Sequence, residues 1–468
     1  MQREGSLVVN ILLAVVVMCS CAVAEDKGRP SVQAPTAYKE LRNWKPSEPG
    51  DQLGKGNWWE RFNDPELNRL EESLNISNQN VAAAIANVEA ARAIVRQSRS
   101  QYFPLVTAGP SFARSRVPAD PNGRTVSTYA ATVDASWEPD VFGRVRAAVR
   151  VGRYGLQVNI ADLQNVRLSA QAEPAVDYFG LRTQDDLQQI LDATATSYQE
   201  ALDVARARYT AGLDSDEAVA QAETQLQTTR AQAVNVGVLR AQYERAIAVL
   251  TGQAPSNFVL APQVIALNPP AVPVGIPSEL LERRPDIAAE ERAVMQANAQ
   301  VGVAKKAFFP TLLLTASGGF QSTSAADWFN WPNRVWSVGT SLAETIFDGG
   351  SRRATVQQFQ ATYEATVANY RQTVLIAFQQ VEDNLAAVRI LSDVIHEQDS
   401  AVESARRTLG EADVRYRSGI DPYLNVITAQ TSLLNAQEAA LTFRQQQITA
   451  SVNLIRALGG GWDISQLY

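Results

Sequence analysis

The sequence carries one order of motifs twice, once in each half. In each half an aromatic-proline pair is followed by two alternating segments, a turn containing Phe and Gly, a long helix-forming stretch and an Arg-Tyr-x-x-Gly-x-Asp motif. The matching phrases are "SQYFPLVTAGPSFARS" (100–115) with "KAFFPTLLLTASGGFQS" (306–322), "WEPDVFGRVR" (137–146) with "AETIFDGGSRR" (343–353), and "RYTAGLD" (208–214) with "RYRSGID" (415–421). Self-similarity over this length indicates a duplicated unit, so both halves are expected to fold alike.

The alternating segments, about 103–138 and about 309–347, are predicted to be two strand pairs. Apolar residues occupy one face and small or polar residues the other, the pattern of a membrane barrel wall or, alternatively, of a half-buried soluble sheet. The apolar positions are Tyr129, Ala131, Val133, Ala135, Trp137, Leu312, Leu314, Ala316, Gly318 and Phe320. Residues 334–347 alternate poorly, because Glu344 falls where a lipid-facing residue is expected. Four strands cannot close a barrel of at least about eight, so several copies must contribute.

Two long helix pairs are predicted, one in each half. Residues 350–418 lack proline and are rich in Ala, Gln, Glu and Arg, so they can form one helix about 100 Å long. Within it Val374, Phe378, Val381 and Leu385 are spaced as in a coiled coil. The corresponding first-half helix, 144–210, contains Pro174, where a kink is expected. The other predicted helices cover about 76–101, 214–251, 284–307 and 421–458.

Composition excludes several classes of function. The 468 residues carry a formal net charge of −7 without a Lys/Arg-rich block, which argues against nucleic acid as a partner. With His396 as the one histidine, three methionines and two cysteines, the chain cannot assemble a zinc, copper or haem site, so no metal or cofactor is expected. No Ser/His/Asp, Cys/His or phosphate-loop pattern occurs, so we expect no enzymatic activity.

The N-terminus is predicted to be an export signal. An apolar run from Leu7 to Met18 follows a short polar head containing Arg3, and it is too short to span a bilayer. Met18-Cys19-Ser20-Cys21 fits a bacterial lipobox, which would make Cys21 the lipidated residue, whereas Ala22-Val23-Ala24 fits ordinary signal peptidase. Acylation gives an otherwise unexplained cysteine a purpose, so Cys21 is the favoured site.

Several phrases resemble one family, the outer-membrane factors of tripartite efflux pumps, in particular the OprM/NodT lipoprotein branch of the TolC-like proteins. They are spread in family order over nearly the whole mature chain. The phrases are "CAVAEDKGRP" (21–30), "NWWERFNDPELNRL" (57–70), "PSELLERRPDIAAEE" (277–291), "NAQVGVAKKAFFPTLLLTASGG" (298–319), "RYRSGIDPYLNVITAQTSLLNAQ" (415–437) and "ALGGGW" (457–462).

The resemblance implies a mixed α+β membrane protein that acts as a homotrimer. Four strands from each chain would form a twelve-stranded outer-membrane barrel, continued through the periplasm by an α-helical coiled-coil barrel. Such a protein is a passive exit duct of a Gram-negative bacterium, anchored in outer-membrane lipid. Its expected partners are a periplasmic adaptor (membrane fusion protein) and an inner-membrane transporter, commonly of the RND class.

The resemblance also organises the chain into segments. They are a signal peptide (1–20), an N-terminal extended or equatorial segment (21–75), a first repeat (76–255, with strands at about 103–138 and long helices at about 144–251), a Pro-rich equatorial strap (256–283), a second repeat (284–462, with strands at about 309–347 and long helices at about 350–458) and a C-terminal tail (463–468).

The repeated Arg-Tyr-x-x-Gly-x-Asp motif is predicted to join two helices. Gly212 and Gly419 can end one helix, Asp214 and Asp421 can cap the next, and Pro422 suits the first helical position. The resemblance places this turn at the periplasmic tip of the duct, with adaptor-docking residues Arg208, Tyr209, Gly212, Leu213, Asp214, Arg415, Gly419 and Ile420. It assigns the closed gate to Leu424, Thr428, Asn425, Tyr416 and Asp421.

The gate departs from the family pattern. Related proteins often have aspartate where Asn425 and Thr428 stand, and a ring of carboxylates selects cations. Neutral side chains cannot act in that way, so a steric ring of Leu424 is the expected seal.

Two other classes of protein remain as alternatives, a soluble periplasmic coiled-coil adaptor and a pore-forming toxin.

Replacing the predicted lipidation site gives the first test. Cys21→Ser should abolish incorporation of a labelled fatty acid into the mature protein, because the acylated thiol is removed. Cys19→Ser, the matched control, should leave labelling intact. Undiminished labelling of the Cys21→Ser protein would show that the lipid is attached elsewhere.

Overall fold

The computed structural model describes residues 34–35, 37–39, 57–117, 124–270 and 280–462, which divide into two compact units. The described part of the first unit lies within residues 89–158 and 290–371, and the second unit comprises 33–88, 159–289 and 372–468. The predicted signal peptide, Cys21 and the tail 463–468 lie outside the described residues.

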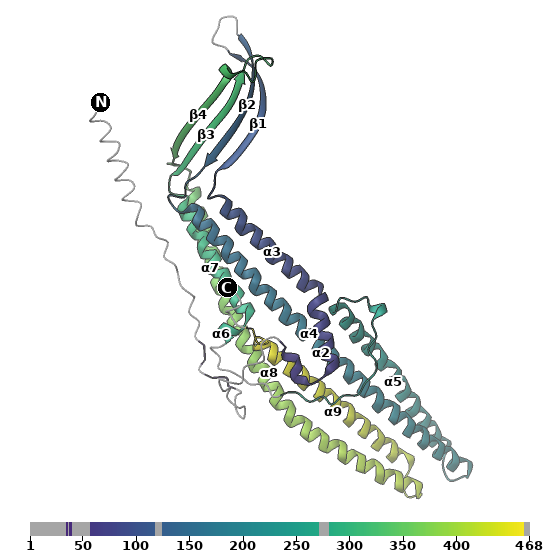
Figure 1. Cartoon of the computed structure of the whole chain (residues 1–468). Coiled ribbons are helices and arrows are strands. Elements are labelled where there is room, and N and C mark those ends of the chain that lie inside the picture. Colours follow the sequence, from purple (N-terminus) through teal and green to yellow (C-terminus); the bar gives the residue numbers. More distant parts are fainter. Residues whose placement is uncertain (1–33, 36, 40–56, 118–123, 271–279, 463–468) are drawn as a thin grey trace. The chain divides into compact units, whose positions relative to one another are not determined.

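The first unit contains an antiparallel sheet of four strands in the order β1-β2-β3-β4 (Figure 1). The strands are β1 (Leu105–Val117), β2 (Arg124–Trp137), β3 (Thr311–Ser322) and β4 (Arg334–Ala343). The two strand pairs predicted from the repeats are therefore joined side by side through β2 and β3. In the described chain, β1 and β4 are the edges of this sheet and each pairs on one side alone.

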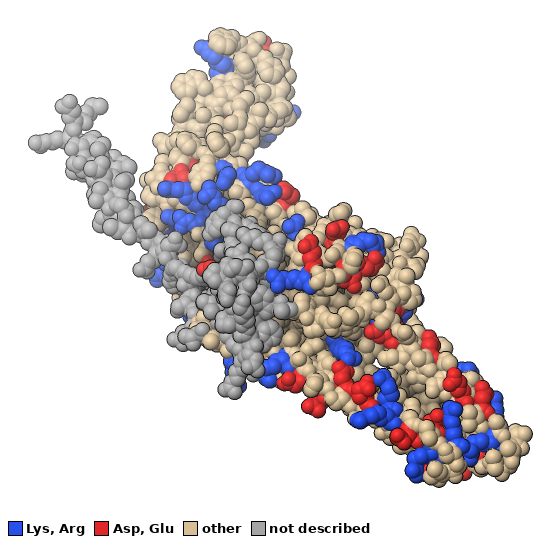
Figure 2. Space-filling model, turned by 60° about the horizontal axis from the view of Figure 1, so that its bottom comes forward, with Lys and Arg blue, Asp and Glu red and all other residues tan. Residues whose placement is uncertain are grey.

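The sheet has one apolar and one polar face, because cross-strand partners share a face and successive residues alternate. The register puts Val106, Phe112, Tyr129, Val133, Ala135, Trp137, Leu314, Ala316, Trp336, Val338 and Leu342 on one face. It puts Thr107, Ser111, Thr132, Asp134, Ser136, Thr315, Ser317, Ser337 and Ser341 on the other. Figure 2 shows the sheet nearly free of charged side chains on the visible face.

The poor alternation expected for 334–347 is wrong for β4. Trp336, Val338, Thr340 and Leu342 alternate regularly with small residues, and the strand ends at Ala343. Glu344 therefore lies beyond the strand and places no charge on the apolar face.

Long helix pairs follow the strand pairs, as predicted. They are α4 (Arg144–Thr210) with α5 (Asp216–Leu250), and α8 (Ser351–Arg417) with α9 (Tyr423–Ala457). The shorter helices α3 (Gln79–Ser100) and α7 (Pro285–Lys306) precede the strand pairs. Helix α4 continues through Pro174, and the kink expected there stays a prediction. In α8 the coiled-coil positions Val374, Val381 and Leu385 are fully buried.

Part of the segment predicted to be extended is helical. Residues Trp58–Phe62 form a 3₁₀ turn and α2 covers Pro65–Ser77. Asp64 caps α2, since its Oδ1 accepts the backbone N–H groups of Glu66 and Leu67 at 2.9 and 3.0 Å, and Pro65 occupies the first helical position. The apolar residues Leu67, Leu70 and Leu74 bury one face of the helix, which an extended chain could not present.

The Pro-rich strap lies across α4 and α5, whose side chains form hydrogen bonds with the backbone of the strap. Between Phe258 and residue 270 it contains neither helix nor strand. Two buried side chains and one partly buried side chain bind its peptide groups. The buried Arg182 donates to the carbonyl of Ala261 (2.8 Å), the buried Asp185 accepts from the N–H of Gln263 (3.0 Å), and the partly buried Arg240 donates to the carbonyl of Leu260 (2.7 Å). Asp185 also pairs with both arginines, at 2.9 and 2.7 Å. Arg240 lies 3.6 Å from Glu244 as well, so two carboxylates balance the two guanidinium charges.

Helix α2 contains an unusual buried acid, Glu71. Its side chain is fully buried, and neither carboxylate oxygen makes a hydrogen bond to any described residue. Burial raises the pKa of Glu71 well above its ordinary value, because the charged form loses its hydration.

Removing the titratable group of Glu71 should change the pH dependence of stability. Because the pKa of Glu71 is raised in the folded state, its contribution to the free energy of unfolding is fully present at low pH. That contribution is lost as the pH rises through the folded-state pKa. Glu71→Gln should therefore raise the thermal unfolding midpoint by several degrees at about pH 8 and leave it nearly unchanged near pH 4, as measured by circular dichroism. The exposed neighbour provides the control, Glu72→Gln. An equal gain at both pH values would contradict titration of Glu71.

Candidate functional site at the helical tips

Both copies of the Arg-Tyr-x-x-Gly-x-Asp motif form the same helix-ending turn. The N–H of Leu213 donates to the carbonyl of Arg208 at 2.9 Å, and the N–H of Ile420 donates to the carbonyl of Arg415 at 2.9 Å. The glycines between them, Gly212 and Gly419, have φ of 71° and 74°. This left-handed conformation is strained for a residue with a Cβ, so the turn requires glycine.

The residues that begin the next helices differ from those predicted. Ser215, not Asp214, caps α5, because its side chain accepts the N–H of Ala218. Pro422 stands at the cap position of α9, one residue before the helix, and has no side-chain acceptor to offer. The aspartates Asp214 and Asp421 are instead engaged by arginine and tyrosine side chains. A signal for Ser215 was present, since serine followed by two acidic residues is typical of a helix start.

In the second copy the arginine and the aspartate of the motif bind each other. Arg415 binds Asp421 through two hydrogen bonds, at 2.6 and 3.1 Å. This interaction lowers the pKa of Asp421. Arg415 is half exposed, so the ion pair fixes the local turn more than it adds stability.

In the first copy the corresponding aspartate binds the second copy as well. Asp214 accepts a 2.8 Å hydrogen bond from the hydroxyl of Tyr416, while Arg208 lies 3.4 Å from the same oxygen. Arg208 also covers the ring of Tyr416, 4.9 Å from its centroid, and donates to the carbonyl of Arg417 at 3.3 Å. Burial by itself would raise the pKa of Asp214, but the hydrogen bonds from Tyr416, Ser215 and Arg208 lower it. One carboxylate thus ties the two tips of the chain together.

A hydrophobic cluster lies behind this polar contact. Tyr416 is 2% exposed and its ring lies 5.1 Å from that of Tyr423. The cluster consists of Tyr198, Leu202, Ala205, Ala218, Ala222, Leu226, Tyr416, Tyr423 and Val426, drawn from all four long helices. Tyr423 is not among the site residues predicted from the sequence, although its place one turn before Val426 and Ile427 marks a buried helix face.

The remaining predicted site residues are on the surface of the chain. Leu213 and Ile420 project from the two turns with 67% and 63% exposure. Leu424 is 57% exposed, and Asn425 and Thr428 are exposed beside it. The hydroxyl of Thr428 donates to the carbonyl of Leu424 at 2.8 Å. Exposed large apolar residues at a tip favour contact with another protein. Tyr209, the first-copy counterpart of buried Tyr416, is 49% exposed.

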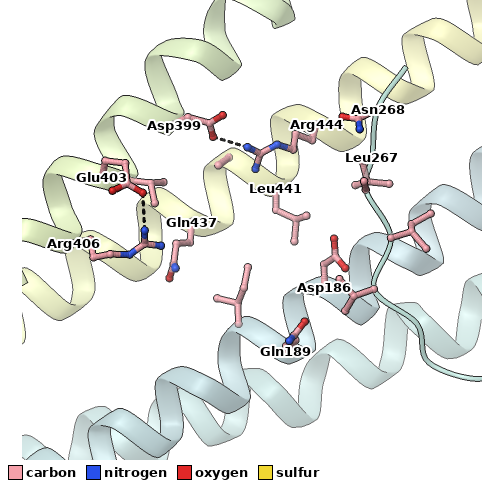
Figure 3. A pocket seen from close by; sticks show the side chains of 16 residues that line it. Asp186, Gln189, Leu267, Asn268, Asp399, Glu403, Arg406, Gln437, Leu441 and Arg444 are labelled. Carbon is pink, nitrogen blue, oxygen red and sulfur yellow. Dashed lines mark hydrogen bonds and ion pairs between the residues drawn. The ribbon is translucent and has the colours of Figure 1, made fainter. Parts of the chain in front are cut away.

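A pocket of about 680 Å³ opens further along the second unit, between α4, α8, α9 and the strap (Figure 3). Its arginines are paired with carboxylates, Arg444 with Asp399 and Arg406 with Glu403, each at 2.6 Å. Across the pocket, burial and then the neighbouring Asp185 raise the pKa of Asp186 to about 6. Both arginine charges of the pocket are thus balanced by carboxylates of α8.

Among the described residues, no group of three or more His, Cys, Asp and Glu residues could hold a metal ion. The described helices include none that is both long and apolar enough to cross a membrane.

Residues 70–253 and 276–460 match the model of a family described as outer membrane efflux protein. The chain belongs to the outer membrane efflux protein family. The two matched stretches fall one on each repeat, in agreement with the duplication.

Relatives within this family are similar along almost the entire chain. The antibiotic efflux pump outer membrane protein ArpC of Pseudomonas putida is 30% identical over 460 residues, covering 97% of this chain and 95% of ArpC. The solvent efflux pump outer membrane protein SrpC of the same species is 33% identical over 416 residues, 87% of this chain and 88% of SrpC. The solved outer-membrane channel OprN superposes with a TM-score of 0.86 at 29% identity, covering 93% of this chain and 99% of OprN.

These findings confirm the predicted family, fold class and outer-membrane location. The protein is an outer-membrane component of an efflux pump, with a four-stranded sheet and two long helix pairs in each chain. The soluble adaptor and the pore-forming toxin, which the sequence left open, do not fit this family.

The tie between the two tips can be tested by removing one hydroxyl. Tyr416→Phe keeps the ring packing but deletes the hydrogen bond to Asp214, a loss of about 0.5–1.5 kcal/mol. Local opening of the tip, measured by hydrogen exchange of peptides covering 208–214 and 415–423, should increase roughly two- to tenfold. Tyr209→Phe, at the half-exposed counterpart, should have no such effect. Unchanged exchange in Tyr416→Phe would contradict the tie.

Proposed function

We propose that the chain assembles as a homotrimer and serves as the passive exit duct of a tripartite efflux pump. It would conduct antibiotics, solvents or other small molecules through the outer membrane of a Gram-negative bacterium. The observation that carries this proposal is the four-stranded sheet, which has one apolar and one polar face and leaves both edges without a partner strand in the described chain. A sheet of this kind is completed by further copies, and three copies supply twelve strands, enough for a closed wall.

The partners of the duct are proposed from the same family. A periplasmic adaptor would dock on the tips through Leu213 and Ile420, and it would connect the duct to an inner-membrane transporter of the RND class. Support comes from the fixed geometry of the two turns and from the exposure of these two side chains. Lipid attached to Cys21, outside the described residues, would anchor the chain in the outer membrane.

The gate is proposed to be steric. Leu424 and Thr428 lie one turn apart on the exposed side of α9, where three copies could bring them together on the axis of the duct. Because Leu424, Asn425 and Thr428 are uncharged, their ring would exclude solutes by size and not by charge. The duct itself would be without catalytic activity or cofactor, and the transporter would select the substrate.

Charge placed on one docking residue tests the role of the tips. Ile420→Asp should leave trimers intact but reduce cross-linking to the adaptor by about tenfold or more, because it removes an apolar contact from an interface. The same variant should fail to restore antibiotic export in a host that lacks its own outer-membrane component. Ile76→Asp, at a residue of α2 with 86% exposure, is the matched control and should export normally. Normal cross-linking and export by Ile420→Asp would contradict docking at the tips.

A further inference from the structure

The two repeats meet within the chain through a pair of phenylalanines at one end of the sheet. Phe142 follows β2 and Phe309 precedes β3, the strand paired with β2. Their rings are stacked, with centroids 5.6 Å apart and planes at 17°. The ammonium group of Lys306 donates to the carbonyl of Phe142 at 2.8 Å and fastens the same junction. The turn that follows the strand pair of the first repeat is thus joined to the aromatic-proline segment of the second repeat.

The duplicated counterparts of these phenylalanines have no ring partner among the described residues. Phe347 follows β4 as Phe142 follows β2, and Phe103 precedes β1 as Phe309 precedes β3. Phe347 is 87% exposed and Phe103 is 71% exposed. They lie at the two opposite edges of the sheet, because β1 and β4 are its outer strands. Ile346, next to Phe347, is 96% exposed.

We propose that Phe347 of one copy stacks on Phe103 of the next copy and forms the junction between protomers. The inference rests on the proposed trimer, in which β4 of one chain would neighbour β1 of the following chain. β4 of one chain would then pair with β1 of the next chain as β2 pairs with β3 within the chain. The segment after β4 would therefore lie beside the segment before β1 of the next chain, just as the segment after β2 lies beside the segment before β3. The stacked pair within the chain is therefore the template for the pair between chains.

The two kinds of junction differ in one interaction. Ser100 occupies the position that corresponds to Lys306, and its hydroxyl donates to the carbonyl of Gln97 in its own helix at 2.8 Å. No ammonium group is available from that position to bind the carbonyl of Phe347. Stacking and apolar burial consequently carry more of the junction between chains than of the junction within the chain.

Thiol cross-linking distinguishes the two junctions. In the full-length protein in outer membranes, Phe103→Cys combined with Phe347→Cys should give covalent dimers and trimers with a short bismaleimide. Each single variant should give almost none, which also controls for Cys19 and Cys21. Phe142→Cys combined with Phe309→Cys should lose its free thiols but remain monomeric on a denaturing gel, because that junction lies within one chain.

A second pair of variants measures how much each junction contributes to assembly. Phe347→Ala should lower the temperature at which the trimer dissociates on a detergent gel, whereas Phe142→Ala should lower it much less because Lys306 still bridges that turn. Equal effects of the two variants would contradict the assigned partner.

The outcomes separate the junction from the assembly on which it rests. A trimer captured by an amine-reactive cross-linker without any thiol cross-link between residues 103 and 347 would overturn the junction and leave the duct intact. Under those conditions Phe347 would face lipid, and a membrane-soluble thiol reagent would label Phe347→Cys. Absence of a trimer with either reagent would overturn both the junction and the proposed assembly.

Discussion

The open edges of the sheet are the constraint on which the rest of the structure depends. Peptide groups along β1 and β4 have no strand partner on their outer sides in the described chain, and such groups are costly to leave unpaired in lipid. Duplication supplies a solution, because the chain already contains one junction between its two repeats, at β2 and β3. Repeating that junction between copies would close the sheet without any new kind of contact. In both repeats a long helix pair follows the strand pair along the chain.

The two repeats differ where the chain must join its own halves. In the second copy Asp421 is bound by Arg415 of the same motif, whereas in the first copy Asp214 binds both Arg208 and Tyr416 of the other motif. The same motif therefore makes a local turn in one place and a tie between tips in the other. Burial of Tyr416 and exposure of Tyr209 follow from this difference, since the tyrosine of the second copy faces the first copy of the same chain.

Much of this fold follows from local patterns, and the exceptions have identifiable causes. Alternation with a period of two gave the correct faces of β2 and β3, but it could not locate the end of β4, so Glu344 seemed to lie on the apolar face. Helix α2 was missed even though Asp64-Pro65 is a capping signal and Leu67, Leu70 and Leu74 have helical spacing, because the resemblance assigned this stretch to an extended or equatorial segment. The choice of Ser215 over Asp214 as a cap depends on Tyr416, a residue 202 positions away from Asp214. No local pattern reports a contact over that separation.

The tips combine a constant backbone with variable charge. Both turns have the same hydrogen bonds and nearly the same φ at glycine, so Leu213 and Ile420 are presented in equivalent ways. Beside them the arginines differ: the side chain of Arg208 is 19% exposed and that of Arg415 is 52% exposed. An adaptor that recognises the apolar residue could therefore use either tip, while the accessible guanidinium at the second would favour one register over the other. Apolar contact would provide the binding affinity, and charge would determine which tip each adaptor copy binds around the duct.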